Sequence, residues 1–169
     1  MMDIQLRNWQ LADVGALQAL ADNKKIADNL RDGFVHPYTL KDAEDYIQSC
    51  IQADERRAGP CAIIVDGVLA GSIGVFYGGD VYRKRAEIGY WLGEPFLGRG
   101  IITQAITMIC QKVFDDGDII RIYAEPFAPN IGSRRALEKA GFILEGIKKR
   151  SVYKNGQLLD SCIYALLKE

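Results

Sequence analysis

The segment Leu97–Thr103 combines residue types that could bind a phosphate. It reads Leu-Gly-Arg-Gly-Ile-Ile-Thr and lies between an expected strand and a strongly periodic helix. Gly98 and Gly100 let the backbone turn tightly and approach a ligand closely. The backbone N–H groups at a helix start, together with the positive end of the helix dipole, favour an anion. Arg99 could add a charge-assisted contact and Thr103 a hydroxyl donor. The alternative is a glycine-rich turn that only starts a helix.

The same loop differs from two common nucleotide-binding patterns. A third glycine is missing where a dinucleotide fingerprint needs it, and the loop lies far from an N-terminal strand–helix–strand unit. It also lacks the Gly-Lys-Ser/Thr ending of a P-loop. A nucleotide-dependent oxidoreductase is therefore disfavoured, and a ligand other than NAD or ATP is the better interpretation.

A second segment with candidate ligand-binding groups runs from Pro129 to Phe142. Asn130 is a suitable helix N-cap, Ser133 falls in the first helical turn, and Gly141 ends the helix. Good local helix chemistry accounts for these residue types whether or not they also have a second role.

In this order and spacing, these segments resemble the GNAT superfamily of N-acetyltransferases. Three stretches carry the resemblance: Ala86–Leu92 (Ala-Glu-Ile-Gly-Tyr-Trp-Leu), Gly98-Arg99-Gly100 leading to Thr103, and Asn130-x-x-Ser133 running to Gly141-Phe142. The chain looks most similar to the ribosomal-protein alanine N-acetyltransferase (RimJ/RimL-like) branch, as does its final hairpin around Tyr153–Gly156. The resemblance covers nearly the whole chain. It is weakest from Leu11 to Gly59, the part that shapes the acceptor pocket in this family.

The resemblance implies acetyl-CoA (coenzyme A) as co-substrate, without a metal. The sheet would splay between the strand ending at Leu92 and the strand Ile119–Ala124. The pantetheine arm would lie in that gap, and the Leu97–Thr103 loop would hold the pyrophosphate. The cofactor-binding residues that follow are Tyr90, Trp91, Leu92, Leu97, Gly98, Arg99, Gly100, Ile101, Ile102, Thr103 and Asn130.

The resemblance also suggests catalytic groups for acetyl transfer to an amine: Ser133, Glu87 and Asn130. Ser133 is the expected proton donor to the departing thiolate, or the organiser of a donating water, because the tyrosine that many family members carry one turn later is Leu137 here. Asn130 would anchor coenzyme A or the loop before the helix. Glu87 is the expected base, directly or through a water, with Glu125 in reserve. The alternatives are a first-turn helix serine and a solvated strand carboxylate.

Two residues of the loop depart from the family pattern. Leu97 stands where Gln or Arg is usual, and Ile102 replaces a Gly or Ala. Backbone donors do not depend on side chains, so cofactor binding should survive. These departures motivate a second interpretation, a catalytically weak acyl-CoA-binding or sensor domain.

The sequence leaves the acceptor amine open. An α-amine has a pKa near ~8 and a lysine-type amine near ~10.4, so deprotonating the latter costs about 3 kcal/mol more. Because no side chain is an unambiguous base, the sequence slightly favours an acceptor of low pKa. Such an acceptor is the α-amine of a protein N-terminus, or an amine of depressed pKa on a small molecule such as a polyamine, amino sugar or antibiotic. His36 and Tyr38 lie in an irregular connection that would border the acceptor site, although a lone histidine is more often structural.

Apolar periodicity predicts the elements that position these residues. Asp66-Gly67 and Asn155-Gly156 indicate hairpin turns. The expected strands are Ile4–Trp9, Cys61–Val65, Val68–Phe76, Arg85–Leu92, Ile119–Ala124, Phe142–Tyr153 and Leu158–Leu167, and the expected helices are Leu11–Leu20, Thr39 to about Ala53, Gly100–Phe114 and Asn130–Ala140. This order predicts one α+β (mixed α/β) domain over residues 1–169. The resemblance implies a largely antiparallel sheet of about seven strands, splayed in the middle and flanked by about four helices.

Composition is typical of an ordinary soluble globular protein and does not favour a nucleic-acid binder. The chain is 49% hydrophobic and 25% charged, with a formal net charge of −1. Its basic residues are scattered, whereas a phosphate-neutralising protein usually has a basic excess. The runs Arg83–Arg85 and Lys148–Arg150 are expected to be solvated, although the first could meet the adenosine 3′-phosphate.

The cysteines and the chain start favour a cytoplasmic protein. Cys50, Cys61, Cys110 and Cys162 lack paired spacing, which predicts reduced, buried thiols. With His36 the sole histidine, a zinc site is not expected. Neither a secretory signal nor a membrane span is expected. A homodimer is a guess from the resemblance.

Overall fold

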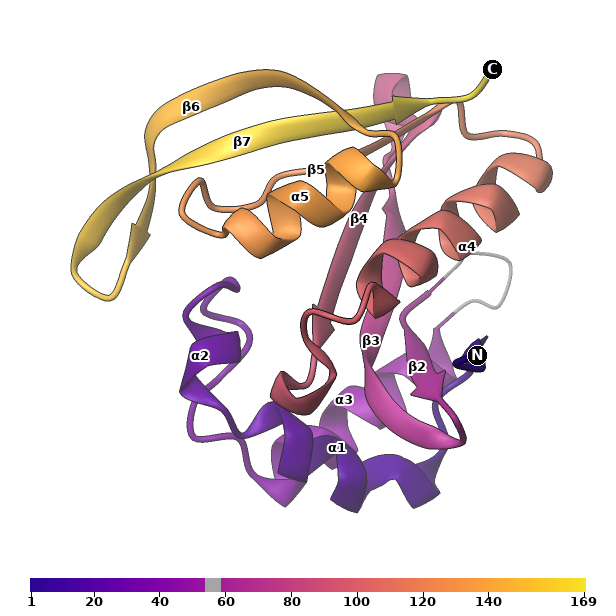
Figure 1. Ribbon diagram of the computed structural model, residues 1–169, viewed down its shortest axis with the longest axis vertical. Coiled ribbons are helices and arrows are strands. Elements are labelled where there is room, and N and C mark those ends of the chain that lie inside the picture. Colours follow the sequence, from indigo (N-terminus) through magenta and orange to yellow (C-terminus); the bar gives the residue numbers. More distant parts are fainter. Residues whose placement is uncertain (54–58) are drawn as a thin grey trace.

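The computed structural model describes residues 1–53 and 59–169, and its centre is a seven-stranded sheet (Figure 1). The spatial order is β1-β2-β3-β4-β5-β7-β6. Neighbouring strands run antiparallel, except that β4 and β5 are parallel. The strands are β1 (Ile4–Arg7), β2 (Cys61–Val65), β3 (Val68–Tyr77), β4 (Arg85–Leu92), β5 (Arg121–Ala124), β6 (Ile143–Lys154) and β7 (Gln157–Leu167). This mixed, mostly antiparallel sheet confirms the predicted fold class.

Both predicted hairpin turns are present, and their backbone angles explain their residue types. Asp66 and Gly67, between β2 and β3, have φ of 49° and 82°, and Asn155 and Gly156, between β6 and β7, have 50° and 75°. Two successive positive φ values match the twist of a two-residue hairpin, and Asn, Asp and Gly tolerate them best. These turns fix which strands become neighbours at the two ends of the sheet.

Helices cover the two faces of the sheet. The helices are α1 (Val14–Ala21), α2 (Lys24–Ala27), α3 (Leu40–Gln52), α4 (Ile101–Asp115) and α5 (Ile131–Lys139). Successive strand residues face opposite sides. Accordingly, Ile63 of β2 packs in the core formed with α4 and α5, whereas its neighbours Ala62 and Ile64 pack in the core formed with α1 and α3. The two faces are called the α4/α5 face and the α1/α3 face below.

Local sequence explains where the long helices begin. Thr39 caps α3: its hydroxyl accepts a hydrogen bond from the Asp42 N–H at 3.2 Å, and the Asp42 carboxylate accepts from the Thr39 N–H at 2.8 Å. In α4, the residues at helical spacing are buried: Ile101, Ala105, Ile106, Ile109 and Val113. This helix therefore lies firmly on the sheet, with its start fixed beside the end of β4.

Several expectations needed correction. The short helix α2 was not predicted, because four residues are too few for apolar periodicity to show. β5 begins at Arg121 rather than Ile119, and β1 ends at Arg7 rather than Trp9, whose side chain is buried against α1 and α3. All four cysteines are free thiols, but only Cys110 and Cys162 are buried, while Cys50 and Cys61 are half-buried. In the described part of the chain, none of the helices has the length and hydropathy needed to cross a membrane.

Candidate active site

The most distinctive feature of the sheet is the gap between β4 and β5. The two strands pair only where Arg85–Glu87 meets Arg121–Tyr123. Beyond Glu87, β4 continues to Leu92 while still paired with β3 on its other side. Alternate residues of this stretch turn their backbone N–H and C=O groups towards the gap. The expected splay is therefore present, and it offers a backbone edge to an extended ligand.

A pair of hydroxyl groups joins β4 to α5 beside this gap. The hydroxyl oxygens of Tyr90 and Ser133 lie 2.6 Å apart. Tyr90 packs against the core of the α4/α5 face, which places the pair on that face. Burial raises the pKa of Tyr90 to about 12, although the hydrogen bond with Ser133 acts in the opposite direction. The phenol is therefore neutral near pH 7, and either hydroxyl can donate the hydrogen bond between them.

The other predicted residues of α5 have structural roles. Asn130 is the N-cap: its side-chain oxygen accepts a hydrogen bond from the Ser133 N–H at 3.3 Å. This bond fixes the first turn and therefore the position of Ser133. Leu137, one turn further along, is fully buried in the core. That position offers no group to the gap.

The loop before α4 has the geometry of an anion cradle. Gly98 and Gly100 adopt the left-handed conformation, with φ of 73° and 75°, which glycine accepts without strain. The helical bonding of α4 begins at Gln104, whose N–H donates to the Gly100 carbonyl at 3.2 Å. The N–H groups of residues 101–103 therefore point out of the helix start without helical partners. They suit a phosphate oxygen.

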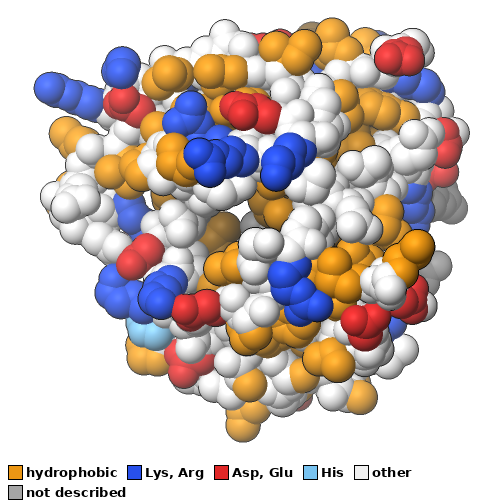
Figure 2. All heavy atoms as spheres, viewed as in Figure 1, with side chains coloured by type: hydrophobic (Ala, Val, Ile, Leu, Met, Phe, Trp, Pro, Cys, Tyr) orange, Lys and Arg blue, Asp and Glu red, His pale blue; other side chains and the backbone are white. Residues whose placement is uncertain are grey.

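The isoleucine side chains of the loop pack towards the core, so an anion at the loop would be bound by backbone N–H groups. Ile101 is buried in the core and Ile102 packs against it, while Leu97 is exposed. Arg99 is exposed, and its guanidinium contacts the Met2 sulfur at 3.3 Å. Figure 2 shows Lys and Arg side chains around a hollow near the middle of this face, where α5 and the loop before α4 approach each other. Basic side chains therefore lie near the loop, although acidic ones are also present on this face.

Trp91 and Leu92 use their side chains for packing on opposite faces. The Trp91 ring meets the Phe34 ring edge-on at 5.6 Å on the α1/α3 face. Leu92 is buried in the core of the α4/α5 face. Any contact of these two residues with a ligand in the gap must therefore come from their backbone groups.

Glu87 lies on the face opposite to Tyr90 and Ser133, because it is three positions before Tyr90 along β4 and successive strand residues alternate between the two faces. Its carboxylate accepts a hydrogen bond from Arg31 Nη2 at 2.6 Å, and Tyr123 Oη lies 3.5 Å from its second oxygen. The Glu87 side chain is 23% exposed, against 75% for Arg31. Glu87 is therefore a half-buried carboxylate that solvent and a ligand can reach. It is paired with the guanidinium of Arg31, a mostly exposed side chain.

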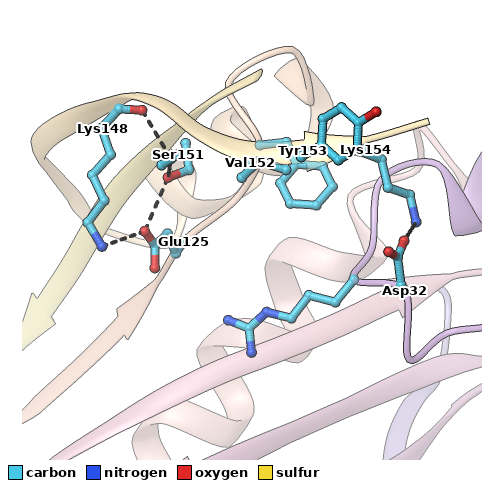
Figure 3. Close-up of a pocket in the computed structure, with 10 residues that line it drawn as sticks. Asp32, Glu125, Lys148, Ser151, Val152, Tyr153 and Lys154 are labelled. Carbon is cyan, nitrogen blue, oxygen red and sulfur yellow. Dashed lines mark hydrogen bonds and ion pairs between the residues drawn. The ribbon is translucent and has the colours of Figure 1, made fainter. Parts of the chain in front are cut away.

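Two cavities flank this carboxylate. The larger, about 360 Å³, lies between the connection that follows α2 and the β6–β7 hairpin (Figure 3). Its lining residues are Arg31, Asp32, Glu125, Phe127, Lys148, Ser151, Val152, Tyr153, Lys154 and Ser161. Glu87 itself lines the smaller cavity, about 280 Å³, together with Arg85 and Tyr123 among others. Arg31 thus connects the larger cavity to Glu87.

Comparison with known proteins identifies the family. The model of the acetyltransferase (GNAT) domain matches residues 3–143. This chain belongs to the GNAT acetyltransferase family. It is 35% identical over 106 residues to the putative ribosomal N-acetyltransferase YdaF of Bacillus subtilis, an alignment that covers 63% of this chain and 57% of YdaF. The chain therefore spans little more than half the length of this curated relative.

Solved GNAT structures match over nearly the whole chain. The microcin C7 self-immunity acetyltransferase MccE, in complex with acetyl-CoA and AMP, superposes with a TM-score of 0.85 at 30% identity and covers 98% of this chain and 93% of its own. RimL, the ribosomal L7/L12 alpha-N-protein acetyltransferase in complex with coenzyme A, gives 0.83 at 27% identity, with coverage of 97% and 93%. These two neighbours hold acetyl-CoA and coenzyme A, respectively.

His36 and Tyr38, which were expected to border the acceptor site, lie in the connection between α2 and α3. His36 is exposed, with Nδ1 3.5 Å from an Asp22 carboxylate oxygen, and Tyr38 is buried with its ring stacked on Phe34. Neither lines a cavity described above. The run Arg83–Arg85 begins β4, at the opposite end of that strand from the loop before α4. It is therefore poorly placed to meet a phosphate bound at that loop.

Sequence reasoning missed the cations that line the larger cavity. Lys148 is exposed, as expected of a solvated charged run, but the sequence did not indicate that its Nζ binds the Glu125 carboxylate at 2.7 Å in the cavity lining. Lys154 is largely buried, with Nζ 2.9 Å from Asp32. Arg31 lies in the segment with the weakest family likeness. The partners of Arg31 and Lys154 are 56 and 122 residues away, so no local pattern signals them.

Proposed function

We propose that this chain transfers the acetyl group of acetyl-CoA to an α-amine, by direct attack of the amine on the thioester. The observation that carries the proposal is the placement of two suitable groups on opposite faces of one open gap. Ser133 with Tyr90 approaches from the α4/α5 face, and Glu87 approaches from the α1/α3 face. A thioester lying in the gap would have a proton donor on one side and a base on the other.

The residues of the cradle and gap fit coenzyme A. The pyrophosphate would take the backbone N–H groups that the start of α4 leaves unpaired, so Leu97 and Ile102 need not contribute side chains. The pantetheine amides would extend the sheet along the free edge of β4 at Tyr90–Leu92. Hydrogen bonds to backbone groups account for such binding with little dependence on sequence.

On the α4/α5 face, Ser133 would protonate the leaving group. As the carbon–sulfur bond breaks, the thiolate takes the Ser133 hydroxyl proton, and Tyr90 returns its phenolic proton to the serine oxygen. Phenols are far more acidic than serine alcohols, so the relay runs in this direction. Tyr90 is then reprotonated from solvent after product release. General acid catalysis of this kind contributes about 10²–10⁴-fold.

On the α1/α3 face, Glu87 would take the proton that the amine loses. An α-amine, with a pKa near ~8, is partly neutral at physiological pH, so a half-exposed carboxylate or a water held by it is a sufficient acceptor. Positioning the amine against the thioester supplies much of the remaining rate. For the amine to bind Glu87, the ion pair between Arg31 and Glu87 must then break.

The names of relatives support an α-amine on a protein. YdaF is named as a putative ribosomal N-acetyltransferase, and RimL as an alpha-N-protein acetyltransferase of ribosomal L7/L12. We therefore propose a protein N-terminus as acceptor, with the reaction in the cytoplasm, where ribosomal proteins are made. MccE is named as a microcin C7 self-immunity acetyltransferase, and this name supports a small-molecule amine as the second candidate acceptor.

The second candidate function is an acyl-CoA-binding domain without turnover. Leu97 and Ile102 favour it, together with the Arg31 guanidinium that occupies the proposed base. Calorimetry with coenzyme A separates the two functions when it is combined with a transfer assay. Binding without acetyl transfer to any amine would favour this candidate.

The test is thiol release from acetyl-CoA with α-amino peptides, polyamines, aminoglycosides and amino acids as acceptors. We expect acceptor-dependent release that falls in Ser133→Ala and in Glu87→Gln. Ser49→Ala and Glu44→Gln, on the exposed side of α3, are the matched controls and should retain the rate. Release that is equal in all five proteins would remove Ser133 and Glu87 from the mechanism. No release together with no coenzyme A binding would overturn both candidate functions.

A further inference from the structure

The charged groups around the larger cavity form three ion pairs. Arg31 binds Glu87 at 2.6 Å, Lys148 binds Glu125 at 2.7 Å, and Lys154 binds Asp32 at 2.9 Å. Glu87 belongs to the smaller cavity, so the larger one is lined by three cations and two carboxylates. Its charge balance therefore depends on whether Arg31 keeps its partner on Glu87.

The three pairs differ in how easily they can open. The Lys154 side chain is only 9% exposed, and its bond to Asp32 joins the β6–β7 hairpin to the connection after α2. This pair lies at one end of the set of lining residues, as Figure 3 shows. Arg31 and Lys148 are 75% and 51% exposed. Ion pairs this exposed are worth about 0–1 kcal/mol, so a ligand can replace either partner.

An amine that reaches Glu87 changes the partner of Arg31. The ammonium competes with the guanidinium for the carboxylate, and once Glu87 has taken a proton it no longer attracts a cation. Arg31 still lines the larger cavity after losing that bond. The cavity is then lined by an unpaired guanidinium as well as by the partly exposed ammonium of Lys148. An anionic group on the acceptor itself would restore the balance.

Resting on the acetyl transfer proposed above, we propose that the acceptor is a peptide α-amine followed by an acidic side chain at its second or third residue. The α-amine lies at Glu87, and the acidic side chain binds in the larger cavity between Arg31 and Lys148. Arginine and lysine are the side chains that bind carboxylates most strongly through charge-assisted hydrogen bonds. Phe127, Val152 and Tyr153 provide an apolar wall for the intervening chain.

The size of the cavity limits the recognised segment to the first few residues. An extended chain advances about 3.3–3.6 Å per residue, and a cavity of about 360 Å³ is at the small end of ligand sites. Polyamines and aminoglycosides would bring further cations next to Lys148, Lys154 and the displaced Arg31. The same charges that attract an acidic peptide therefore reject polycationic amines.

The experiment compares C-terminally amidated peptides Ala-X-Ala-Ala and Ala-Ala-X-Ala, with X as Asp, Asn or Lys, and spermidine. The amidated end removes the other carboxylate. We expect kcat/KM at least ten-fold higher for Asp than for Asn at one of the two positions, with Lys below Asn and spermidine lowest. Calorimetric binding of the same peptides to the complex with coenzyme A gives a second readout that does not depend on turnover.

Neighbouring lysines provide a matched pair of variants. Lys148→Gln and Arg31→Gln should each reduce the Asp-to-Asn ratio at least five-fold. Lys149→Gln should leave the ratio unchanged, because Lys149 pairs with Asp160 outside the cavity lining. Equal kcat/KM for Asp and Asn, or a preference for Lys or spermidine, would overturn the acidic-acceptor proposal while acetyl transfer stands. Selective binding of the Asp peptides without any transfer would overturn the proposed function alone, and equal binding without transfer would overturn both.

Discussion

The two faces of the β4–β5 gap differ in the physical character of their reactive groups. On the α4/α5 face, Tyr90 and Ser133 form a neutral, partly buried hydroxyl pair. On the α1/α3 face, Glu87 and Arg31 form a charged pair whose cation is mostly exposed. A partly buried neutral pair that is hydrogen-bonded has a small desolvation cost, whereas an exposed ion pair can exchange partners. The comparison indicates that the proton donor, on the α4/α5 face, keeps one geometry. On the α1/α3 face, where the acceptor amine would bind, Arg31 can leave Glu87; this face is called the adjustable acceptor side.

The largest expected effects concern the Tyr90–Ser133 pair, because Tyr90 should act through Ser133. Ser133→Ala should lower kcat about 100-fold and Tyr90→Phe about 10-fold, with KM for acetyl-CoA little changed. The double variant should be no slower than Ser133→Ala, since groups that act as a unit are not additive. Initial rates at saturating acetyl-CoA measure this.

A second tyrosine–serine pair supplies the control. Tyr46 Oη lies 2.9 Å from Ser72 Oγ, away from the gap and in the core of α1 and α3. Tyr46→Phe removes the same kind of bond and should leave kcat within about two-fold. A relay through Ser133 would be contradicted if the double variant lost kcat by the product of the two single losses. It would also be contradicted if Tyr46→Phe lowered kcat as much as Tyr90→Phe does.

The raised pKa of Tyr90 predicts a smaller effect on alkaline stability. Its folded pKa of about 12 lies above the unfolded value near 10, so the protonated phenol stabilises the fold below about pH 10 and this contribution is lost as the pH rises towards 12. At pH 11 the loss is about 1 kcal/mol, from the two pKa values. Urea unfolding between pH 8 and 11 measures the free energy of unfolding of Tyr90→Phe and of the wild type. This free energy should fall less steeply with pH in the variant. Parallel declines would mean that the Tyr90 phenol is hydrated.

The smallest effect should come from Arg31. Arg31→Gln should change the free energy of unfolding by less than about 0.5 kcal/mol, because its ion pair is exposed. Asn130→Ala, which removes the N-cap beside Ser133, should cost about 1 kcal/mol. Urea unfolding at pH 7 measures the free energy of unfolding of both variants and of the wild type. A loss in Arg31→Gln as large as that in Asn130→Ala would mean that the acceptor side is not adjustable.

The parts of the site that the sequence predicted are those set by local chemistry. Gly98 and Gly100, the periodic helix that follows, and the cap at Asn130 all depend on neighbouring residues, and each lies where it was expected. The contact between Tyr90 and Ser133 spans 43 residues, and that between Arg31 and Glu87 spans 56. Such contacts depend on strand order and on which face each side chain takes. Propensity and periodicity in one sequence do not encode them.

The most direct test of two faces serving one gap is a crystal structure of the chain with a non-hydrolysable acetyl-CoA analogue and an Ala-Asp peptide. We predict the atom that replaces the thioester sulfur within hydrogen-bonding distance of Ser133 Oγ, and the peptide amine on the Glu87 side of the same carbonyl, with Arg31 turned away from Glu87. An acetyl group bound outside the β4–β5 gap, or an amine approaching from the Ser133 side, would contradict the account.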